Sequence, residues 1–299
     1  MDNIRYFTNL KLNIMVDKIN FLEQIDHSNY IHAANYLQKF KQYDTLKKRQ
    51  QEALDDLLIK YSKFYKGNLE IIGYGKNEIK KRTKLLNDYF NYYKDNYDNF
   101  FTAQGKFRST IIEEFMYVLF KDLISDIKIK IKDETDSLKM GGTKAYTNLY
   151  FSAKNLKNFI VNPQIGVNQK NQDFAIYRPI TLNIKDAGTI QANLPVVAIE
   201  NKTYIDKTML EGSVATADKI KAGNPYSLFI IVTETYDVDL SVDPAYSRID
   251  QIYVLRKGKD RNVPIFYDVL NDLVENVNNH LVRNWSDIEN KMKKYGKII

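Results

Sequence analysis

The most informative segment of the chain is Pro195-Val196-Val197-Ala198-Ile199-Glu200-Asn201-Lys202, because it joins an apolar run to a carboxylate and an ammonium. The run is too apolar for a strand that faces solvent, and Pro195 fits the first residue of a strand. Alternate residues of a strand point to the same face, so Glu200 and Lys202 are expected to project side by side. A charged pair at the end of a buried strand is costly unless it has a function, and we therefore interpret this stretch as a catalytic strand.

The residues that follow predict a parallel βαβ unit. Residues 208–222 carry apolar side chains at helical spacing, and the break Gly223-Asn224-Pro225 ends that pattern. Residues 228–232 are wholly apolar, as in strands that are buried on both faces of a sheet. This order indicates a crossover connection, and hence an α/β fold with a mixed central sheet flanked by helices. Further strands are predicted over residues 172–177, 180–184 and 249–255, with a C-terminal helix or helix pair over 269–294.

The chain changes character near residue 105. Residues 1–105 contain no proline and show apolar residues at spacings of three and four, which predicts a helical region. Lysines and tyrosines are interleaved there, and tyrosines at helical spacing indicate core or interface rather than a surface that stacks on bases. Residues 106–299 predict the α/β domain. It is expected to begin with a helix over 109–124, a strand over 127–132 and a glycine-marked loop over 140–151.

The composition excludes several classes of protein. The 299 residues include no cysteine, which excludes disulfides and thiolate zinc sites, and the presence of only 3 histidines makes a histidine metal site unexpected. The 44 basic and 37 acidic side chains give a net charge of +7, which suits a polyanionic partner or a lysine-rich solvated surface equally well. No apolar run approaches the roughly 20 residues that span a bilayer, and the N-terminus lacks a signal-peptide pattern. We therefore expect a cytoplasmic protein without membrane contact.

A second carboxylate completes a candidate metal site. Asp173 begins the apolar run 174–176, which places it at the start of a predicted strand. Two carboxylates on neighbouring strands, together with the backbone carbonyl near Asn201, form an oxygen-rich site of the kind that Mg²⁺ prefers. With Lys202 beside it to hold a water, such a site can hydrolyse a phosphodiester. Taken alone, the pair of Glu200 and Lys202 also fits an ion pair on a solvated sheet face.

The pattern Asp173 … Glu200-Asn201-Lys202 resembles the motif of the PD-(D/E)xK nuclease superfamily. Longer stretches resemble a group within it, the BbvCI- and DdeI-like type II restriction endonucleases. These stretches lie between residues 109 and 257 and include Ile112-Glu113-Glu114-Phe115, 195–211, 216–221, Pro225-Tyr226 and 248–256. The resemblance implies a PD-(D/E)xK nuclease core in residues 106–299. Residues 1–105 are then expected to clasp DNA or to mediate dimerisation.

The resemblance also implies roles for individual residues. Asp173 and Glu200, with the backbone carbonyl of Asn201, are implied to hold Mg²⁺. Lys202 is implied to be the catalytic lysine. In this sequence Phe174 follows the first acid and no proline precedes it, which is a common departure from the superfamily pattern.

An additional acid is implied on the preceding helix, where Glu113 or Glu114 resembles a residue that related nucleases use for catalysis. Because the two are adjacent in a helix, only one can face the site, and their spacing does not decide which. A favourable interaction with the helix dipole near the N-terminus explains this acidic pair equally well.

For partners, the resemblance implies double-stranded DNA, cut at a specific site with a CTNAG-like core to leave 5′-phosphate and 3′-hydroxyl ends. One active site cuts one strand, so a homodimer or a heterodimer with a second nuclease subunit is implied, together with a cognate DNA methyltransferase. Bases must be contacted outside the metal site. Thr143, Lys144, Tyr146 and Asn148 have side chains that suit DNA contacts, and a plain connecting loop fits them equally.

Two other functions stay open from the sequence alone. One is a structure-specific or repair DNA nuclease with the same core, which plasmid digestion into discrete fragments would distinguish from a restriction enzyme. The other is a DNA-binding subunit that acts only in a heterodimer. The presence of Asp173, Glu200 and Lys202 together argues against an inactive nuclease fold.

Overall fold

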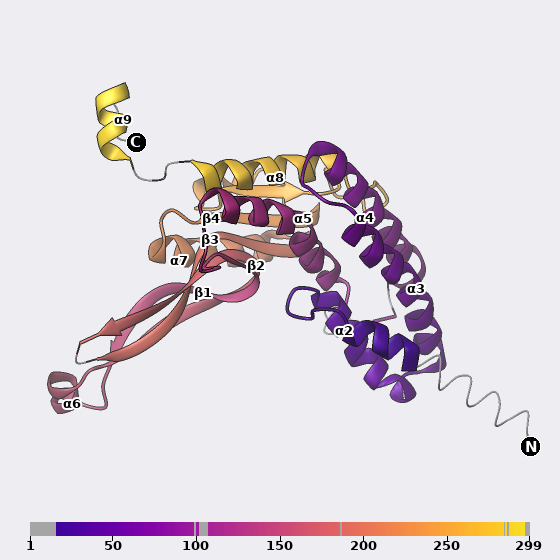
Figure 1. Ribbon diagram of the computed structural model, residues 1–299, viewed down its shortest axis with the longest axis horizontal. Helices are drawn as coiled ribbons and strands as arrows, with labels where there is room; N and C mark the ends of the chain where they lie inside the picture. The colour runs from indigo at the N-terminus through magenta and orange to yellow at the C-terminus, as the bar shows by residue number, and fades with distance from the viewer. Residues whose placement is uncertain are drawn as a thin grey trace, which may run out of the picture.

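The computed structural model describes residues 16–98, 100–101, 107–185, 187–283, 285 and 287–296. In this part of the chain, long helices form one side of the molecule, and a twisted sheet with flanking helices forms the other (Figure 1). The sheet has five strands in the order β1-β2-β3-β4-β5. They are β1 (Lys139–Ser152), β2 (Gln164–Ile184), β3 (Gly188–Ile205), β4 (Leu228–Tyr236) and β5 (Gln251–Val254).

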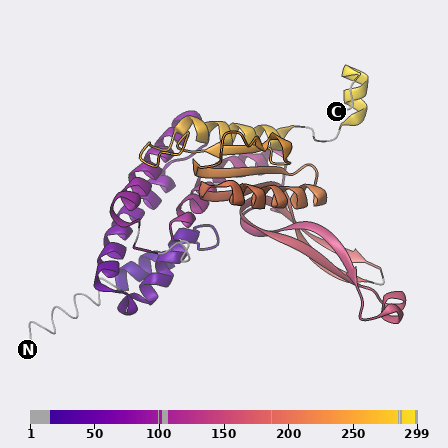
Figure 2. The same cartoon turned by 180° about the vertical axis from the view of Figure 1, so that it is seen from behind.

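The helices divide between the N-terminal region and the two faces of the sheet. The N-terminal region contains α2 (Ile31–Lys41), the 3-10 turn η1 (Tyr43–Thr45), α3 (Lys48–Glu70) and α4 (Lys76–Tyr97). One face of the sheet packs against α5 (Ser109–Lys130) and α8 (Tyr267–Val282), and the other packs against α7 (Lys207–Gly223), which is nearer the viewer in Figure 2. The short elements are α6 (Leu156–Val161), η3 (Pro244–Tyr246) and α9 (Ile288–Tyr295). Within the described ranges, no helix has both the length and the hydrophobicity that crossing a bilayer requires.

The predicted βαβ unit is confirmed. β3 and β4 are parallel, with Val197 opposite Leu228, and α7 connects them across the sheet. β4 and β5 are also parallel, whereas β1–β2 and β2–β3 are antiparallel. The sheet is therefore mixed, as the order of apolar segments indicated.

Alternation along β3 divides the hydrophobic core in two. Val197 and Ile199 belong to the larger core, which extends from Leu22 in the N-terminal region to Val277 in α8. Ala198 belongs to a smaller core beneath α7. This strand is buried on both faces, which explains why its sequence is an unbroken apolar run.

Four tyrosines of the N-terminal helices are core residues, as their helical spacing predicted. Tyr36, Tyr61, Tyr89 and Tyr93 are each at most 1% exposed. The rings of Tyr36 and Tyr61 stack with centroids 5.0 Å apart, and the hydroxyls of Tyr36 and Tyr89 are hydrogen-bonded at 2.7 Å. These rings are therefore not available to stack on nucleic-acid bases.

Two predictions about local structure are wrong. The segment 127–132 is not a strand, because α5 continues to Lys130. Ile127 is 3% exposed whereas Ile129 and Ile131 are 77% and 59% exposed, so the alternating isoleucines do not form a buried face. The segment 140–151 is not a loop, because it lies within β1, where Gly141 adopts a left-handed φ of 128° next to a register shift.

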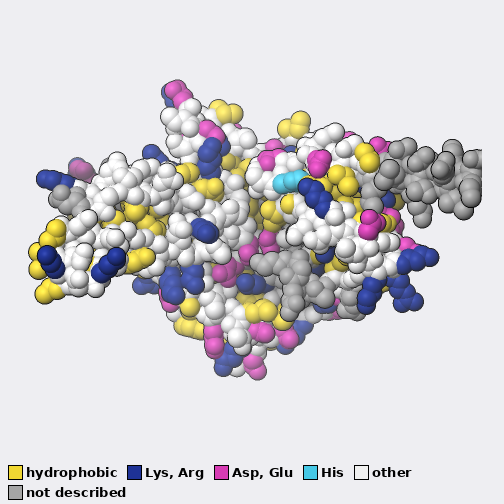
Figure 3. All heavy atoms as spheres, turned by 90° about the horizontal axis from the view of Figure 1, so that it is seen from below, with side chains coloured by type: hydrophobic (Ala, Val, Ile, Leu, Met, Phe, Trp, Pro, Cys, Tyr) yellow, Lys and Arg dark blue, Asp and Glu magenta, His cyan; other side chains and the backbone are white. Residues whose placement is uncertain are grey.

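β2 pairs with two strands in succession, which builds a long arm. Its residues 164–177 pair with β1 and its residues 174–184 pair with β3. The two hairpins extend to the lower left of Figure 1, and α6 lies at the far end. Hydrophobic and basic side chains gather there, at the left of Figure 3. A further parallel pairing of Ala145 with Asn193 ties β1 to β3 inside the arm.

A buried ionic cluster joins the helical region to the sheet. Glu234 of β4 is 0% exposed, and Arg108 donates to both of its carboxylate oxygens at 2.7 and 2.8 Å. The Nε atoms of Arg256 and Arg261 lie 3.3 and 3.5 Å from the same carboxylate. Arg108 and Arg261 also bind Asp98, which follows α4, at 2.8 and 3.0 Å. A buried carboxylate needs such partners, because its desolvation is otherwise uncompensated.

We expect Gly223→Ala to destabilise the fold by about 1–3 kcal/mol, because the last residue of α7 lies against the backbone of β1. A Cβ at Gly223 would lie 2.0 Å from the carbonyl oxygen of Thr147, and no rotamer change can relieve a clash with backbone. Gly212→Ala is the matched control in the same helix, where a Cβ meets nothing within 4 Å. Urea unfolding should show a loss for the first variant and none for the second. Equal stabilities would contradict the close approach of α7 to β1.

Candidate functional site

The pairing of β2 with β3 brings Asp173 to the end of the apolar run. Phe174 lies opposite Ile199 in the antiparallel ladder, so Asp173 is next to Glu200 and Asn201. The Asp173 carboxylate accepts a hydrogen bond of 2.8 Å from the backbone N–H of Asn201. The carboxylate of one strand is thus fixed to the backbone of the neighbouring strand.

Glu200 and Lys202 project toward α7. The Glu200 residue is 9% exposed, and its Oε2 accepts a hydrogen bond of 2.5 Å from the Ser213 hydroxyl in α7. The Lys202 ammonium lies 3.8 Å from the same oxygen, and its side chain is 31% exposed. Glu200 is therefore held by one neutral donor and one cation, while the ammonium keeps access to solvent.

The structure thus brings Asp173, Glu200 and Lys202 together, as the sequence predicted. Phe174 belongs to the core on the α5 side of the sheet, so strand alternation turns Asp173 toward the α7 side, which Glu200 also faces. The cluster lies at the C-terminal end of the apolar run of β3, where the strand passes from core to surface.

This sequence matches the family model described as Bpu10I restriction endonuclease over residues 104–265, more than half of the chain. The chain belongs to the Bpu10I restriction endonuclease family. It is accordingly a type II restriction endonuclease, and the matched segment contains the complete cluster.

A solved structure has the same fold as this restriction endonuclease. A chain of the native BbvCI A2B2 tetramer superposes with a TM-score of 0.65 at 23% sequence identity, covering 84% of this chain and 95% of that chain. The match extends beyond the family segment. No curated protein matches the chain.

The oxygen donors of the cluster fit a magnesium ion. Mg²⁺ is commonly bound by one or two carboxylates together with water and substrate phosphate, rather than by a full protein cage. The described residues contain no group of three or more His, Cys, Asp or Glu side chains that could hold a metal. They do bring the carboxylates of Asp173 and Glu200 to adjacent strands with the Asn201 backbone beside them. Two hard carboxylates suit an open, partly hydrated site of this endonuclease.

The acidic pair on α5 divides between two environments, and the placement of Glu114 corrects its inclusion among the catalytic residues. Glu114 is 1% exposed and faces the N-terminal helices. Its carboxylate accepts hydrogen bonds from the backbone N–H groups of His32 and Ala33 at 2.9 and 3.1 Å, and from the Tyr61 hydroxyl at 2.9 Å. The acid therefore caps the first turn of α2, whose N-cap residue Tyr30 provides no side-chain cap.

Glu113 lies on the other side of α5. Seven residues are close to two helical turns, so Glu113 shares a helix face with Phe120. Phe120 stacks on Phe174 with ring centroids 5.6 Å apart, and Phe174 is adjacent to Asp173. Helix geometry therefore directs Glu113, rather than Glu114, to the sheet.

Sequence reasoning missed Ser213 as a partner of Glu200. Ser213 is 1% exposed and lies in the buried stripe of α7 with Leu210, Ala217 and Ile220. A hydroxyl among the apolar residues of this stripe was the available signal, because a buried hydroxyl requires a hydrogen-bond partner. The Asn201 side chain is also buried, and neither of its polar atoms has a hydrogen-bond partner among the described residues.

The residues predicted to contact DNA all lie in β1. Lys144 and Asn148 are exposed, and Thr143 and Tyr146 are partly buried. Thr143 and Lys144 line a hollow on the arm, and strand pairing places Thr143 opposite Gln172, next to Asp173. Their role in binding DNA stays a prediction.

We expect the stability of this endonuclease to fall as pH rises from 6.5 to 8 because of Glu114. Burial raises the pKa of the Glu114 carboxyl to about 8 from an ordinary value of 4.5, so the folded state holds a proton that the unfolded state releases. Protons bound only in the folded state make stability decrease with rising pH, by up to about 1.4 kcal/mol per pH unit. Buried His32 has a pKa lowered to about 3, and it affects stability only below its ordinary value of 6.5.

Urea unfolding at several pH values should show this slope in the wild-type chain and its loss in Glu114→Gln. The matched control, Glu134→Gln, removes an exposed acid and should keep the slope. A slope that Glu114→Gln leaves unchanged would show that another group is responsible.

Proposed function

We propose that this restriction endonuclease hydrolyses double-stranded DNA with Mg²⁺ at the cluster of Asp173, Glu200 and Lys202. The observation that carries the proposal is the fixed convergence of two carboxylates and one ammonium at the end of a buried strand. An isolated surface ion pair would not need a hydrogen bond from the buried Ser213 or from the backbone of Asn201. These bonds hold the charged groups in one arrangement, as catalysis requires.

Asp173 and Glu200, with the backbone carbonyl of Asn201, would hold the ion. Bound Mg²⁺ neutralises phosphate charge and lowers the pKa of a coordinated water. Lys202 is placed to orient the attacking water and to offset the negative charge that develops on the phosphoryl oxygens. The water oxygen bonds to phosphorus as the bond from phosphorus to the 3′ oxygen breaks, which leaves a 5′-phosphate and a 3′-hydroxyl.

Cleavage of both strands calls for two such clusters, because each one attacks one phosphodiester. We therefore propose that the chain works as a homodimer or with a second nuclease subunit, and the A2B2 composition of the BbvCI tetramer supports the second form. A CTNAG-like target and a cognate DNA methyltransferase complete the proposal. Plasmid digestion followed by mapping of the ends tests the target and the cut positions.

We expect Asp173→Ala and Lys202→Ala each to lower the rate of plasmid cleavage by about 100-fold or more while DNA binding survives. Both residues lie in the cluster and lack a role in the hydrophobic core. Cleavage is measured with purified protein in Mg²⁺, and binding by fluorescence anisotropy with Ca²⁺ in its place. Wild-type rates for either variant would contradict the proposed active site.

We expect Ser213→Ala to raise the Mg²⁺ concentration for half-maximal cleavage by roughly 10-fold, because Glu200 loses the hydroxyl that holds its carboxylate. DNA binding without Mg²⁺ should not change. Thr216→Ala, one turn further along α7, is the matched control, since the Thr216 hydroxyl bonds to the carbonyl of Gly212 instead. An unchanged Mg²⁺ requirement would show that Ser213 only fills space.

A further inference from the structure

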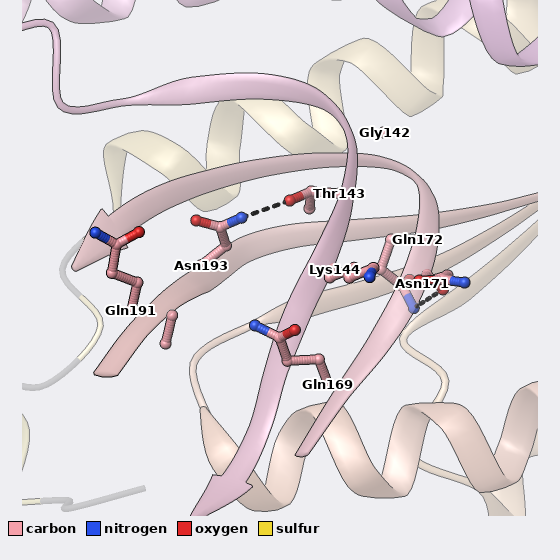
Figure 4. A pocket seen from close by; sticks show the side chains of 9 residues that line it. Gly142, Thr143, Lys144, Gln169, Asn171, Gln172, Gln191 and Asn193 are labelled. Carbon is pink, nitrogen blue, oxygen red and sulfur yellow. Dashed lines mark hydrogen bonds between the residues drawn. The ribbon is translucent and has the colours of Figure 1, made fainter. Parts of the chain in front are cut away.

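We propose that a polar groove on the arm reads base edges of the DNA, with a preference for adenine. We call it the amide groove. Its accessible polar side chains are those of Thr143, Lys144, Gln169, Asn171, Gln191 and Asn193, shown in Figure 4. The inference rests on the proposed cleavage of DNA. It adds that this surface selects the DNA sequence that is cut.

The chemistry of the amide groove matches base edges. Four accessible carboxamides and one buried carboxamide line it together with one lysine, and the described residues that line the groove include no acid. A carboxamide offers a donor and an acceptor side by side, which is the arrangement that pairs with N6 and N7 of adenine in the major groove. A lysine pairs with the acceptors O6 and N7 of guanine. The lack of carboxylates leaves nothing to repel DNA phosphates.

The amide groove is held in shape by contacts between the two hairpins. Asn193 of β3 donates a hydrogen bond of 2.8 Å to the Thr143 hydroxyl of β1, which is drawn dashed in Figure 4. The pairing of Ala145 with Asn193 ties the same strands together. Preorganised side chains lose less entropy on binding, so they discriminate between bases more sharply than mobile ones.

A buried amide in the same place has an unused acceptor. Gln172 is 3% exposed and lines the groove. Its Nε2 donates to the Asn171 carbonyl at 2.9 Å, but its buried Oε1 has no hydrogen-bond partner among the described residues. A buried acceptor without a donor costs free energy. A donor from a bound ligand would remove that cost.

The position of the groove fits a duplex whose backbone is cut at Asp173. Asn171 and Gln169 precede Asp173 on β2 by two and four residues. A strand advances about 3.4 Å per residue, so both amides are within reach of bases that flank a phosphodiester cut at Asp173. A two-stranded ribbon such as β1–β2 has the width that enters the major groove.

The experiment selects bound sequences from a pool of random DNA duplexes with the full chain in Ca²⁺, so that binding is read without cleavage. We expect the wild-type chain to enrich one sequence that contains adenine. Gln169→Ala and Gln191→Ala should each lower the enrichment at one base position by about 10-fold. Gln164→Ala is the matched control, an exposed amide on β2 at the far end of the arm, and it should keep the wild-type preference.

Gln169→Glu is expected to change the preferred base, whereas misfolding would only weaken binding. A carboxylate accepts from N4 of cytosine and lacks the donor that adenine requires, so the preferred base at one position should change from adenine to cytosine. Gln169 is exposed, and the replacement has nearly the same shape, so the fold should persist. A wild-type preference in all three groove variants would overturn the inference, as would a wild-type chain that enriches no sequence.

Plasmid cleavage in Mg²⁺ separates this inference from the proposed function. If the wild-type chain cuts plasmids and the groove variants keep its base preference, the proposed nuclease activity is supported and the amide groove does not select the bases. A wild-type chain that enriches a sequence through Gln169 and Gln191 but neither nicks nor cuts DNA, alone or together with a second nuclease subunit, would support base recognition by the groove and overturn the proposed nuclease.

Discussion

Asp173 meets Glu200 and Lys202 only in one antiparallel register of β2 against β3. Asp173 reaches the Asn201 N–H only because Phe174 lies opposite Ile199. A slip of one residue would turn Asp173 to the opposite face of the sheet. Burial on both faces prevents such a slip, since Phe174 and Ile199 are each at most 1% exposed and would lose their packing. The apolar run of β3 thus fixes the position of charges that lie outside it.

Secondary structure could be predicted from the sequence where the hydrophobic pattern of a segment fitted a single element. The βαβ unit was identified from the apolar runs of β3 and β4 and the helical pattern of α7. Strands that are buried on both faces have unbroken apolar sequences, and β3 and β4 both contribute to the two cores. The segment 127–132 misled because its alternating isoleucines fit a strand, whereas only Ile127 is buried. β1 was missed because it is glycine-containing and half-exposed. Of the amide groove, only Thr143 and Lys144 were predicted from the sequence, since the rest depends on how two hairpins pack together.

The adjacent acids of α5 show why residue type alone does not assign a role. Glu113 and Glu114 differ by about 100° around the helix, so one faces the sheet and the other faces the N-terminal helices. Glu114 then meets two backbone N–H groups and a tyrosine hydroxyl in a buried site. Desolvation outweighs these hydrogen bonds and keeps the carboxyl protonated near neutral pH. Its contribution is to join α5 to α2.

The ionic cluster around Glu234 ties the sheet to the N-terminal helices, so the sheet cannot be separated from them without loss of ion pairs. Its arginines are balanced partly from the helical region, by Asp98 and by the Asn91 oxygen that accepts from Arg256 at 2.9 Å. Shortening the enzyme to its sheet would strip these partners and leave several guanidinium groups crowded around a single carboxylate. The N-terminal helices therefore supply part of the negative charge and hydrogen-bond acceptors that these arginines need. A shortened version of the enzyme would need new acidic or acceptor groups in their place.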